Sequence, residues 1–228
     1  MNILIPMAGV GSRFEQAGYT DPKPFINVHG KYMVDVVLDN IMPSQINSNV
    51  VLVTKKEHNV RGRLGGRSYT ILELEEDTLG TLDTIMRAKN ELDPEVPLLI
   101  ANCDQLIRFD VNDFINISKN VDGHIVTFTS CNSHHSYVTI DGDFIHSIVE
   151  KEVVSNNAVA GVYIFKSTKE FLKAAEKIIS RDIKAKGEFY VSAAIDLMIR
   201  EGKKFICYDS RSIMLGTPQE LERHLNYE

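Results

Sequence analysis

Two glycines and two cations lie close together near the start of the chain, directly after a short apolar run. Gly9 and Gly11 follow Ile3-Leu4-Ile5-Pro6, and the cations are Arg13 and the proline-flanked Lys23. Glycine accepts positive φ and lets a backbone approach a ligand closely, so consecutive N–H groups can point at phosphate oxygens. One cation about 4 Å from a phosphate charge contributes roughly 4 kcal/mol at an effective dielectric constant of about 20. The spacing therefore predicts a strand and loop that bind a nucleoside triphosphate.

Two other phosphate-binding motifs do not fit this loop. A dinucleotide-binding fingerprint would have a third glycine where this chain has Phe14. A P-loop would continue with Gly-Lys-Ser/Thr, where Arg13 and Phe14 stand instead. The alternative is a surface turn whose glycines only satisfy φ. The strand, the loop, the arginine and the lysine between prolines occur together, which favours phosphate binding.

Asp104 follows a second apolar run, Leu98-Leu99-Ile100-Ala101. If this run is a strand, Asp104 lies at its carboxyl end, where open α/β sheets bind ligands. A carboxylate there can hold Mg²⁺ or Mn²⁺ on a triphosphate, because these ions prefer oxygen ligands. The alternative is an aspartate that caps the next turn. Side chains alternate along a strand, so Cys103 is expected to be a packing residue on the opposite face.

The motif Ala8-x-Gly-x-Gly-Ser-Arg13 with Pro22-Lys23-Pro24 resembles the nucleotidyltransferase family that makes nucleotide sugars. Further segments that resemble the family are Thr78–Thr81, Ala101–Asp104, Glu150-Lys151, Ala160–Tyr163 and Leu215–Pro218. The resemblance spans nearly the whole chain and extends to short members that act in capsule and lipopolysaccharide biosynthesis. It implies an enzyme that transfers a nucleoside monophosphate from a triphosphate to a sugar 1-phosphate or similar phosphorylated small molecule and releases pyrophosphate. It places the first metal aspartate at Asp104.

Short apolar, β-branched runs alternate with helical periodicity, which predicts an α/β fold with a mostly parallel sheet covered on both faces. The family's fold is GT-A-like, a three-layer Rossmann-like arrangement. Expected strands are Asn2–Pro6, Val50–Thr54, Tyr69–Leu74 and Pro97–Asn102, and expected helices are Met33–Ile41 and Leu82–Leu92. Two later helices should begin with capping boxes at Ser167/Glu170 and Thr217/Glu220.

The chain is expected to form a single domain over residues 1–228. Residues 1–122 would be the nucleotide-binding half. From about residue 123 shorter strands with turns such as Asp141-Gly142-Asp143 predict a smaller antiparallel portion, so residues 123–228 would form the acceptor-binding portion and the C-terminal return. A length of 228 residues, 43% of them hydrophobic, suffices for one α/β core.

The composition excludes several classes of protein. A formal net charge of −6 argues against a nucleic-acid surface, which would need a basic face. The same charge repels free nucleotides at long range, so local cations and a metal must bind the nucleotide. No signal-peptide pattern and no apolar run that could span a bilayer is present, so we expect a cytoplasmic protein without a membrane partner.

Three separated cysteines, Cys103, Cys131 and Cys207, are expected to be reduced and structural. Homo-oligomerisation remains possible.

The residues expected to bind nucleotide are Ala8, Gly9, Gly11, Ser12, Thr78, Gly80, Thr81 and Asn102. Thr78, Gly80 and Thr81 would form a wall for the base, because a glycine at the mouth of a helix lets the base lie against backbone. Alternatively, Thr78 or Thr81 is simply the N-cap of that helix. Glu75 and Glu76 either help to discriminate the base or are only solvated.

The acceptor side is expected to include Glu150, Lys151, Gly161 and Glu188. Glu150-Lys151 resembles the family's Glu-Lys pair, whose lysine contacts the phosphate of the incoming substrate. Gly161 would let a ligand approach a strand, or it marks a β-bulge or tight bend. Glu188 would accept hydrogen bonds from substrate hydroxyls, or it is an ordinary first-turn helix glutamate. The sequence leaves both pairs of alternatives open.

The sequence departs from the family at one metal position. Many members have a second metal aspartate two residues before the glycine of the late Gly-Thr-Pro motif, where this chain has Met214. Asp209 could substitute if its loop bends back, or one protein carboxylate could suffice with phosphates and water. Gly216 and Thr217 also have an adequate explanation as a helix cap.

No catalytic base is evident in the sequence. An acceptor that is a phosphate monoester, with a second pKa of about 6, is largely a dianion at neutral pH and needs no deprotonation. Lys151 would bring in the acceptor, the metal and Lys23 would stabilise the α-phosphate, and Arg13 with the glycine loop would hold pyrophosphate. Adjacent histidines in a polar loop, His134-His135, are expected to be exposed, with acceptor contact as the alternative.

Two other classes of protein remain open. A glycosyltransferase of similar fold would need an Asp-x-Asp pair, whereas Asn102-Cys103-Asp104-Gln105 offers one acid. A non-catalytic nucleotide-binding module is favoured only by Met214. Within the enzyme class, the acceptor could also be a phosphorylated alcohol or amino compound, as in cytidylyltransferases of the same fold. The identity of the base (CTP, UTP, dTTP, GTP or ATP) is not determined by the sequence.

Overall fold

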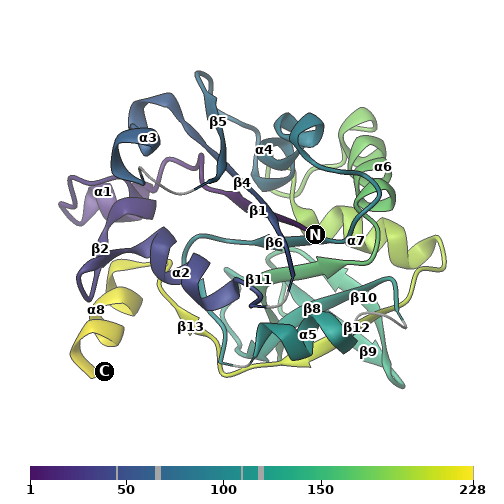
Figure 1. The fold of residues 1–228 in the computed structure, drawn as a ribbon. Helices are drawn as coiled ribbons and strands as arrows, with labels where there is room; N and C mark the ends of the chain where they lie inside the picture. The colour runs from purple at the N-terminus through teal and green to yellow at the C-terminus, as the bar shows by residue number, and fades with distance from the viewer. Residues whose placement is uncertain (45, 65–67, 109, 118–120, 228) are drawn as a thin grey trace.

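A computed structural model of the chain describes residues 1–44, 46–64, 68–108, 110–117 and 121–227. Figure 1 shows one large central sheet with helices on both of its faces. The strands of this sheet are β1 (Asn2–Pro6), β4 (Asn49–Lys55), β5 (Thr70–Leu74), β6 (Leu98–Ala101), β8 (Gly123–Thr129), β9 (Tyr137–Asp141), β10 (Phe144–Val149), β11 (Asn157–Phe165) and β12 (Phe205–Asp209). Two small antiparallel pairs lie beside it, β2 (Asn27–Val28) with β3 (Lys31–Tyr32) and β7 (Gln105–Leu106) with β13 (Ile213–Met214).

The helices connect these strands. The α-helices are α1 (Ser12–Gln16), α2 (Met33–Ile41), α3 (Val60–Arg63), α4 (Thr81–Arg87), α5 (Val111–Ile117), α6 (Thr168–Ser180), α7 (Val191–Arg200) and α8 (Pro218–Tyr227). Short 3₁₀ helices are η1 (Lys23–Phe25), η2 (Lys56–His58) and η3 (Lys89–Glu91).

The amino-terminal half of the sheet is parallel. Strands β5, β4, β1 and β6 are neighbours in that order, and Leu4 of β1 pairs with Val51 on one side and Ile100 on the other. Beyond β6 the sheet continues with β11, which is antiparallel to β6, β8 and β9. The predicted antiparallel portion after residue 123 is present in β8 to β11, but β12 pairs with β8 in parallel. The expectation of shorter strands there is wrong, since β11 has 9 residues. All four expected strands are confirmed to within one residue at each end.

The core lies on both faces of the sheet because every central strand buries alternate side chains on opposite sides. Ile3 and Ile5 of β1 pack in the cluster that holds α2 and α5, whereas Leu4 packs in the cluster that holds α4, α6 and α7. Figure 1 shows these two groups of helices on opposite sides of the sheet. Each fully buried side chain of this kind contributes about 1.5–3 kcal/mol. The predicted three-layer architecture is confirmed.

One expected helix is shorter than predicted. Met33–Ile41 forms α2 with the expected bounds, but the expected helix Leu82–Leu92 ends as an α-helix at Arg87 and continues as η3. From Ala88 onward the backbone hydrogen bonds span three residues instead of four. The N–H of Ala88 donates to the carbonyl of Ile85, and later groups follow the same 3₁₀ pattern.

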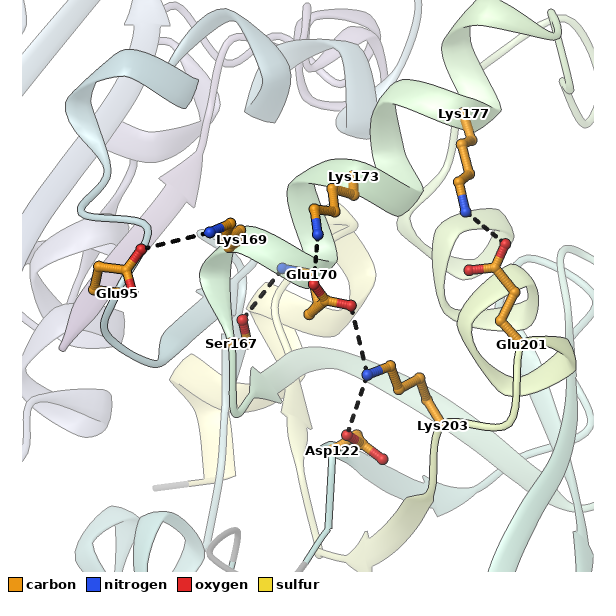
Figure 2. Close-up of polar contacts among 9 residues, drawn as sticks. All are labelled: Glu95, Asp122, Ser167, Lys169, Glu170, Lys173, Lys177, Glu201 and Lys203. Carbon is orange, nitrogen blue, oxygen red and sulfur yellow. Dashed lines mark hydrogen bonds and ion pairs between the residues drawn. The ribbon is translucent and has the colours of Figure 1, made fainter.

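Both predicted helix starts carry their side-chain caps. The Ser167 hydroxyl accepts from the Glu170 N–H at 3.2 Å, and the Thr217 hydroxyl accepts from the Glu220 N–H at 3.2 Å. Figure 2 shows that the Glu170 carboxylate also pairs with Lys173 and Lys203, and that Lys203 reaches on to Asp122 before β8. Exposed ion pairs of this kind contribute about 0–1 kcal/mol each, so the cap matters more than the charges.

Neither a membrane span nor a disulfide occurs in the described part of the chain. None of its helices combines the length and apolar character needed to cross a bilayer. The three cysteines are free thiols, as predicted.

Candidate active site

A cleft of about 420 Å³ opens at the carboxyl ends of β1 and β6. These strands are parallel neighbours, so the loops that follow them meet at one edge of the sheet. Most residues predicted to act in binding or catalysis line the cleft: Ala8, Gly9, Gly11, Lys23, Thr78, Gly80, Thr81, Asn102, Asp104 and Glu188. The other predicted residues are outside this lining: Ser12, Arg13, Glu150, Lys151, Gly161 and Asp209.

The glycine loop joins β1 to α1, and its two glycines have different roles. Gly11 has φ +71°, and a Cβ there would lie 3.1 Å from the Cβ of Lys23, so the loop passes close over that lysine. The expectation of positive φ at Gly9 is wrong, because its φ is outside the left-handed region. No atom lies within 4 Å of a Cβ built at Gly9, so this residue leaves the loop surface open toward the cleft.

Lys23 pairs with Asp104 at the floor of the cleft. Lys23 begins η1, whose next two residues, Pro24 and Phe25, are buried and fix its position. Burial by itself lowers the pKa of Lys23, but the neighbouring Asp104 carboxylate outweighs it and raises the pKa above the usual 10.5. Lys23 is therefore a permanently charged group at neutral pH, placed between the glycine loop and Asp104.

Cys103 is a packing residue, as predicted. It is buried in the same apolar cluster as Ile5 and Leu106. Burial raises the pKa of its thiol to about 12, although the charge of Lys23 acts in the opposite direction. The thiol is protonated at neutral pH and forms part of the cleft wall without being an anionic ligand.

Gly161 lies directly against Asn102, a residue of the cleft lining. Its φ is +71°, and a Cβ there would lie 2.3 Å from both Asn102 Nδ2 and Gln105 Oε1. The Gly161 carbonyl accepts from the Asn102 N–H at 3.0 Å, and the register of β11 against β8 shifts between Val159 and Tyr163. The bend that the sequence analysis gave as the alternative is thus present. Acceptor binding by Gly161 stays a prediction.

The predicted base wall is held by the segment that follows Glu188. A Cβ at Gly80, whose φ is +111°, would lie 2.5 Å from the carbonyl oxygen of Phe189. The Phe189 N–H donates to Leu79 and its carbonyl accepts from Leu82, so two segments distant in sequence form one wall. Only glycine fits at this contact.

The start of α4 is capped differently from either alternative. Its N-cap is Gly80, and neither Thr78 nor Thr81 provides a side-chain cap. The Asp83 carboxylate instead accepts from the Leu79 N–H at 2.9 Å. The two threonines are thus not used as caps, and both line the cleft.

Asp77 is a cleft residue that sequence reasoning missed. Its carboxylate pairs with Lys55 at 2.5 Å, at the end of β4. Glu75, in contrast, pairs with the exposed Lys56 and is outside the cleft lining. The only signal in the sequence was that Asp77 immediately precedes Thr78.

Lys151 and Glu188 meet at Tyr190, another residue that the sequence analysis did not single out. The Lys151 ammonium donates to the Tyr190 hydroxyl, which donates to Glu188, and Lys151 Nζ lies 3.8 Å from Glu188 Oε2. Burial and the neighbouring carboxylates, Glu188 first, raise the pKa of Tyr190 well above 10, so it remains a donor. Because Glu188 lines the cleft, this chain of polar groups connects Lys151 to it.

Glu150 is not part of the cleft lining and instead links two segments through hydrogen bonds to its carboxylate. Its Oε2 accepts from Ser136 at 2.5 Å and from Ser192 at 2.7 Å. The Lys151 N–H donates to the carbonyl of His135 at 3.1 Å, and Lys151 itself has φ +55°. The backbone at Lys151 is therefore fixed by the loop 130–136.

The two histidines of that loop differ. His134 is exposed, as predicted, but the expectation of exposure is wrong for His135, which is half-buried with its ring 5.1 Å from that of Phe128. Burial lowers the pKa of His135, with Glu220 and Asp104 acting in the opposite direction. His135 is thus neutral at physiological pH.

Arg13 and Ser12 lie at the exposed start of α1. The charge of Arg13 acts to lower the pKa values of Lys23 and of His135, which places it within electrostatic range of the cleft. Its predicted contact with a leaving group stays a prediction, as does nucleotide binding by Ser12.

Asp104 fits a role as metal ligand. Its Oδ1 is buried without a hydrogen-bond partner, whereas Oδ2 faces Lys23. A buried anionic oxygen is unfavourable unless a cation or donor satisfies it, and Mg²⁺ prefers such oxygens. Among the described residues no group of three or more His, Cys, Asp or Glu side chains could hold a metal. Asp209, at the exposed end of β12, remains an untested prediction.

Comparisons with known proteins agree with the geometry. A profile of the nucleotidyl transferase family matches residues 3–222. The curated bifunctional protein GlmU of Latilactobacillus sakei subsp. sakei (strain 23K) is 24% identical over 91% of this chain and 46% of its own length. The chain thus spans about half the length of the curated relatives it matches.

Two solved structures share the fold. A nucleoside-diphosphate-sugar pyrophosphorylase from Vibrio cholerae RC9 has a TM-score of 0.83 and 23% identity over 98% of this chain and 99% of the other. A UTP-bound UGPase from Acinetobacter baumannii has a TM-score of 0.80 and 16% identity over 99% of this chain and 92% of the other. With the family profile covering nearly all of the sequence, this chain belongs to the nucleotidyl transferase family.

Proposed function

We propose that this chain transfers a nucleoside monophosphate from a nucleoside triphosphate to a sugar 1-phosphate or a similar phosphorylated small molecule, with release of pyrophosphate. The observation that carries the proposal is the Lys23–Asp104 pair under the glycine loop. It puts a phosphate-binding cation and an unsatisfied carboxylate oxygen at one edge of one cleft. The family match and the UTP-bound fold neighbour support the same assignment.

The reaction needs no general base. A phosphate oxygen of the acceptor attacks the α-phosphorus, and the bond between that phosphorus and the bridging oxygen to the β-phosphate breaks. Pyrophosphate leaves with the electron pair. With a second pKa of about 6 the acceptor phosphate is already a dianion at neutral pH. Lys23 would donate to an oxygen of the α-phosphate, where negative charge must be stabilised during transfer.

The remaining roles are divided along the cleft. Asp104 would hold Mg²⁺ or Mn²⁺, which when bound supplies further charge neutralisation to the triphosphate. The N–H groups of the glycine loop, with Arg13, would hold the leaving pyrophosphate. Lys151 would bind the acceptor phosphate. Glu188 would lie between the two substrates, a placement supported by its position in the cleft lining and its link to Lys151.

We further propose a cytoplasmic role in the synthesis of surface polysaccharide, which rests on the resemblance to short capsule and lipopolysaccharide members. The net charge of −6 supports small-molecule substrates over nucleic acid. Nucleotide sugars are the expected products. Experiments must identify the nucleobase and the acceptor.

Thermal unfolding with Mg²⁺ and each of CTP, UTP, dTTP, GTP and ATP tests the proposal first. A triphosphate at a hundred times its Kd adds about 2.7 kcal/mol, which should raise the Tm by about 5–10 °C for a domain of this size. The preferred triphosphate is then incubated with a panel of sugar 1-phosphates while pyrophosphate is measured. A Tm shift only with nucleoside diphosphate sugars would instead indicate a glycosyltransferase and would refute the roles of Arg13 and Lys23.

A further inference from the structure

A second carboxylate lies beside Asp104, and it belongs to α8. An ideal Cβ built on Gly216 would lie 2.8 Å from Asp104 Oδ2 and 3.6 Å from Glu220 Oε2. Two carboxylate oxygens from distant parts of the sequence thus face the same point. Because residue 216 is a glycine, no side chain fills the space between them.

We propose that Glu220 is the second protein group of the divalent-cation site and binds the ion together with Asp104, directly or through a coordinated water. The assignment of the ion to a triphosphate rests on the proposed function. The affinity of the two carboxylates for the ion does not depend on it. Glu220 would take the role for which the sequence suggested Asp209, at the family position occupied here by Met214.

Backbone contacts hold this segment against Asp104. The Leu215 N–H donates to the Asp104 carbonyl at 2.8 Å, and Met214 pairs with Gln105 in the small sheet of β13 and β7. The chain then turns at Gly216 into α8, where the Thr217 hydroxyl accepts from the Glu220 N–H. These contacts hold the start of α8 close to Asp104.

The Glu220 side chain is available for a ligand. Its backbone N–H is capped by Thr217, and among the described residues its carboxylate makes no hydrogen bond or ion pair. The side chain is half-buried and also lines a neighbouring cavity of about 480 Å³, through which a hydrated ion can reach it.

The buried Oδ1 of Asp104 points to a cation at this place, because it has no partner in the described structure although Oδ2 is paired with Lys23. The position of Glu220 Oε2 near the same carboxylate supplies a second oxygen for such an ion. A divalent ion with oxygen ligands and retained waters suits two carboxylates and an open space.

The test is a titration of the purified chain with Mn²⁺ alone, in which electron paramagnetic resonance reports the free ion. We expect Glu220→Gln to weaken Mn²⁺ binding at least tenfold, and Asp104→Asn to weaken it at least as much. Glu222→Gln is the matched control, because Glu222 lies exposed on the same helix, and it should leave the affinity unchanged. Glutamine also suits the third position of a capped helix, so circular dichroism should show α8 intact.

A second variant keeps both carboxylates and changes only the space between them. The φ of Gly216 is outside the left-handed region, so alanine suits the backbone, but its Cβ would lie 2.8 Å from Asp104 Oδ2. Gly216→Ala should therefore weaken Mn²⁺ binding as well.

Equal Mn²⁺ affinities for the wild-type chain and Glu220→Gln would overturn the proposal, and so would an absence of Mn²⁺ binding to the wild-type chain. The titration contains no nucleotide, so its outcome is separate from that of the transfer assay. A chain that binds Mn²⁺ through Glu220 but releases no pyrophosphate with any triphosphate would refute the proposed function and leave this site in place.

Discussion

The ammonium group of Lys23 pairs with the carboxylate of Asp104, although 81 positions separate the two residues in the chain. The pair joins the loop after β1 to the loop after β6, which are brought together because these strands are parallel neighbours. The Asp104 carboxylate raises the pKa of Lys23, which keeps the ammonium charged at the floor of the cleft.

Replacing Lys23 by methionine should reduce pyrophosphate release by a factor of about 10²–10³, because it removes a donor aimed at developing charge. It also leaves Asp104 buried without its partner, so we expect a loss of about 1–3 kcal/mol in the free energy of unfolding. Lys31→Met is a suitable control, since Lys31 pairs with Asp39 on the exposed surface. Wild-type turnover in Lys23→Met would contradict the proposed site.

Lys151→Met should raise the KM for the phosphorylated acceptor by a factor of about 10–100, which is the value of a charge-assisted hydrogen bond. Tyr190→Phe removes the hydroxyl between Lys151 and Glu188 and should raise the same KM by a smaller factor, about 2–10. Lys173→Met on the surface of α6 is the control. Weaker triphosphate binding with an unchanged acceptor KM would show that the division of the cleft is wrong.

Gly80→Ala should separate the two halves of the base wall. Its Cβ would meet the carbonyl oxygen of Phe189 at 2.5 Å, whereas a Cβ at Gly142 meets no atom within 4 Å although Gly142 also has positive φ. We expect Gly80→Ala to lose at least about 2 kcal/mol more unfolding free energy than Gly142→Ala. Urea unfolding measures the difference, and the triphosphate-dependent rise in Tm should shrink only in Gly80→Ala. Equal effects of the two substitutions would refute the close contact.

His124 should make the fold sensitive to acid. Its ring is fully buried against Phe114, and burial lowers its pKa from 6.5 to about 4. Between these pH values the unfolded chain binds a proton that the folded chain does not, so stability falls as the pH drops through this window. The difference between these two pKa values corresponds to a loss of about 3 kcal/mol.

Urea unfolding between pH 7 and pH 4 measures this dependence. His124→Leu should remove that part of the slope, whereas His146→Leu, at an exposed position, should leave it in place. A slope unchanged in His124→Leu would assign the acid sensitivity to other groups.

The sequence by itself determined the strands, helices and caps that depend on local residue patterns. The apolar run of β1, the helical periodicity of Met33–Ile41 and the caps at Ser167 and Thr217 all lead to the observed structure, because each depends on residues near one another in the chain. The glycine loop and Asp104 could also be located, since both follow apolar runs that must be buried strands.

Other features were decided by tertiary contacts. Gly80 needs glycine because Phe189 lies against it, and Lys151 meets Glu188 both directly and through Tyr190. The sequence offered Asp209 as a second carboxylate because of its nearness to Met214 in the chain. The fold instead places Glu220 beside Asp104, since Leu215 is hydrogen-bonded to Asp104 and the chain turns at Gly216. Local patterns determine strands and helices, but distances between residues far apart in sequence are set by how the finished sheet brings its loops together.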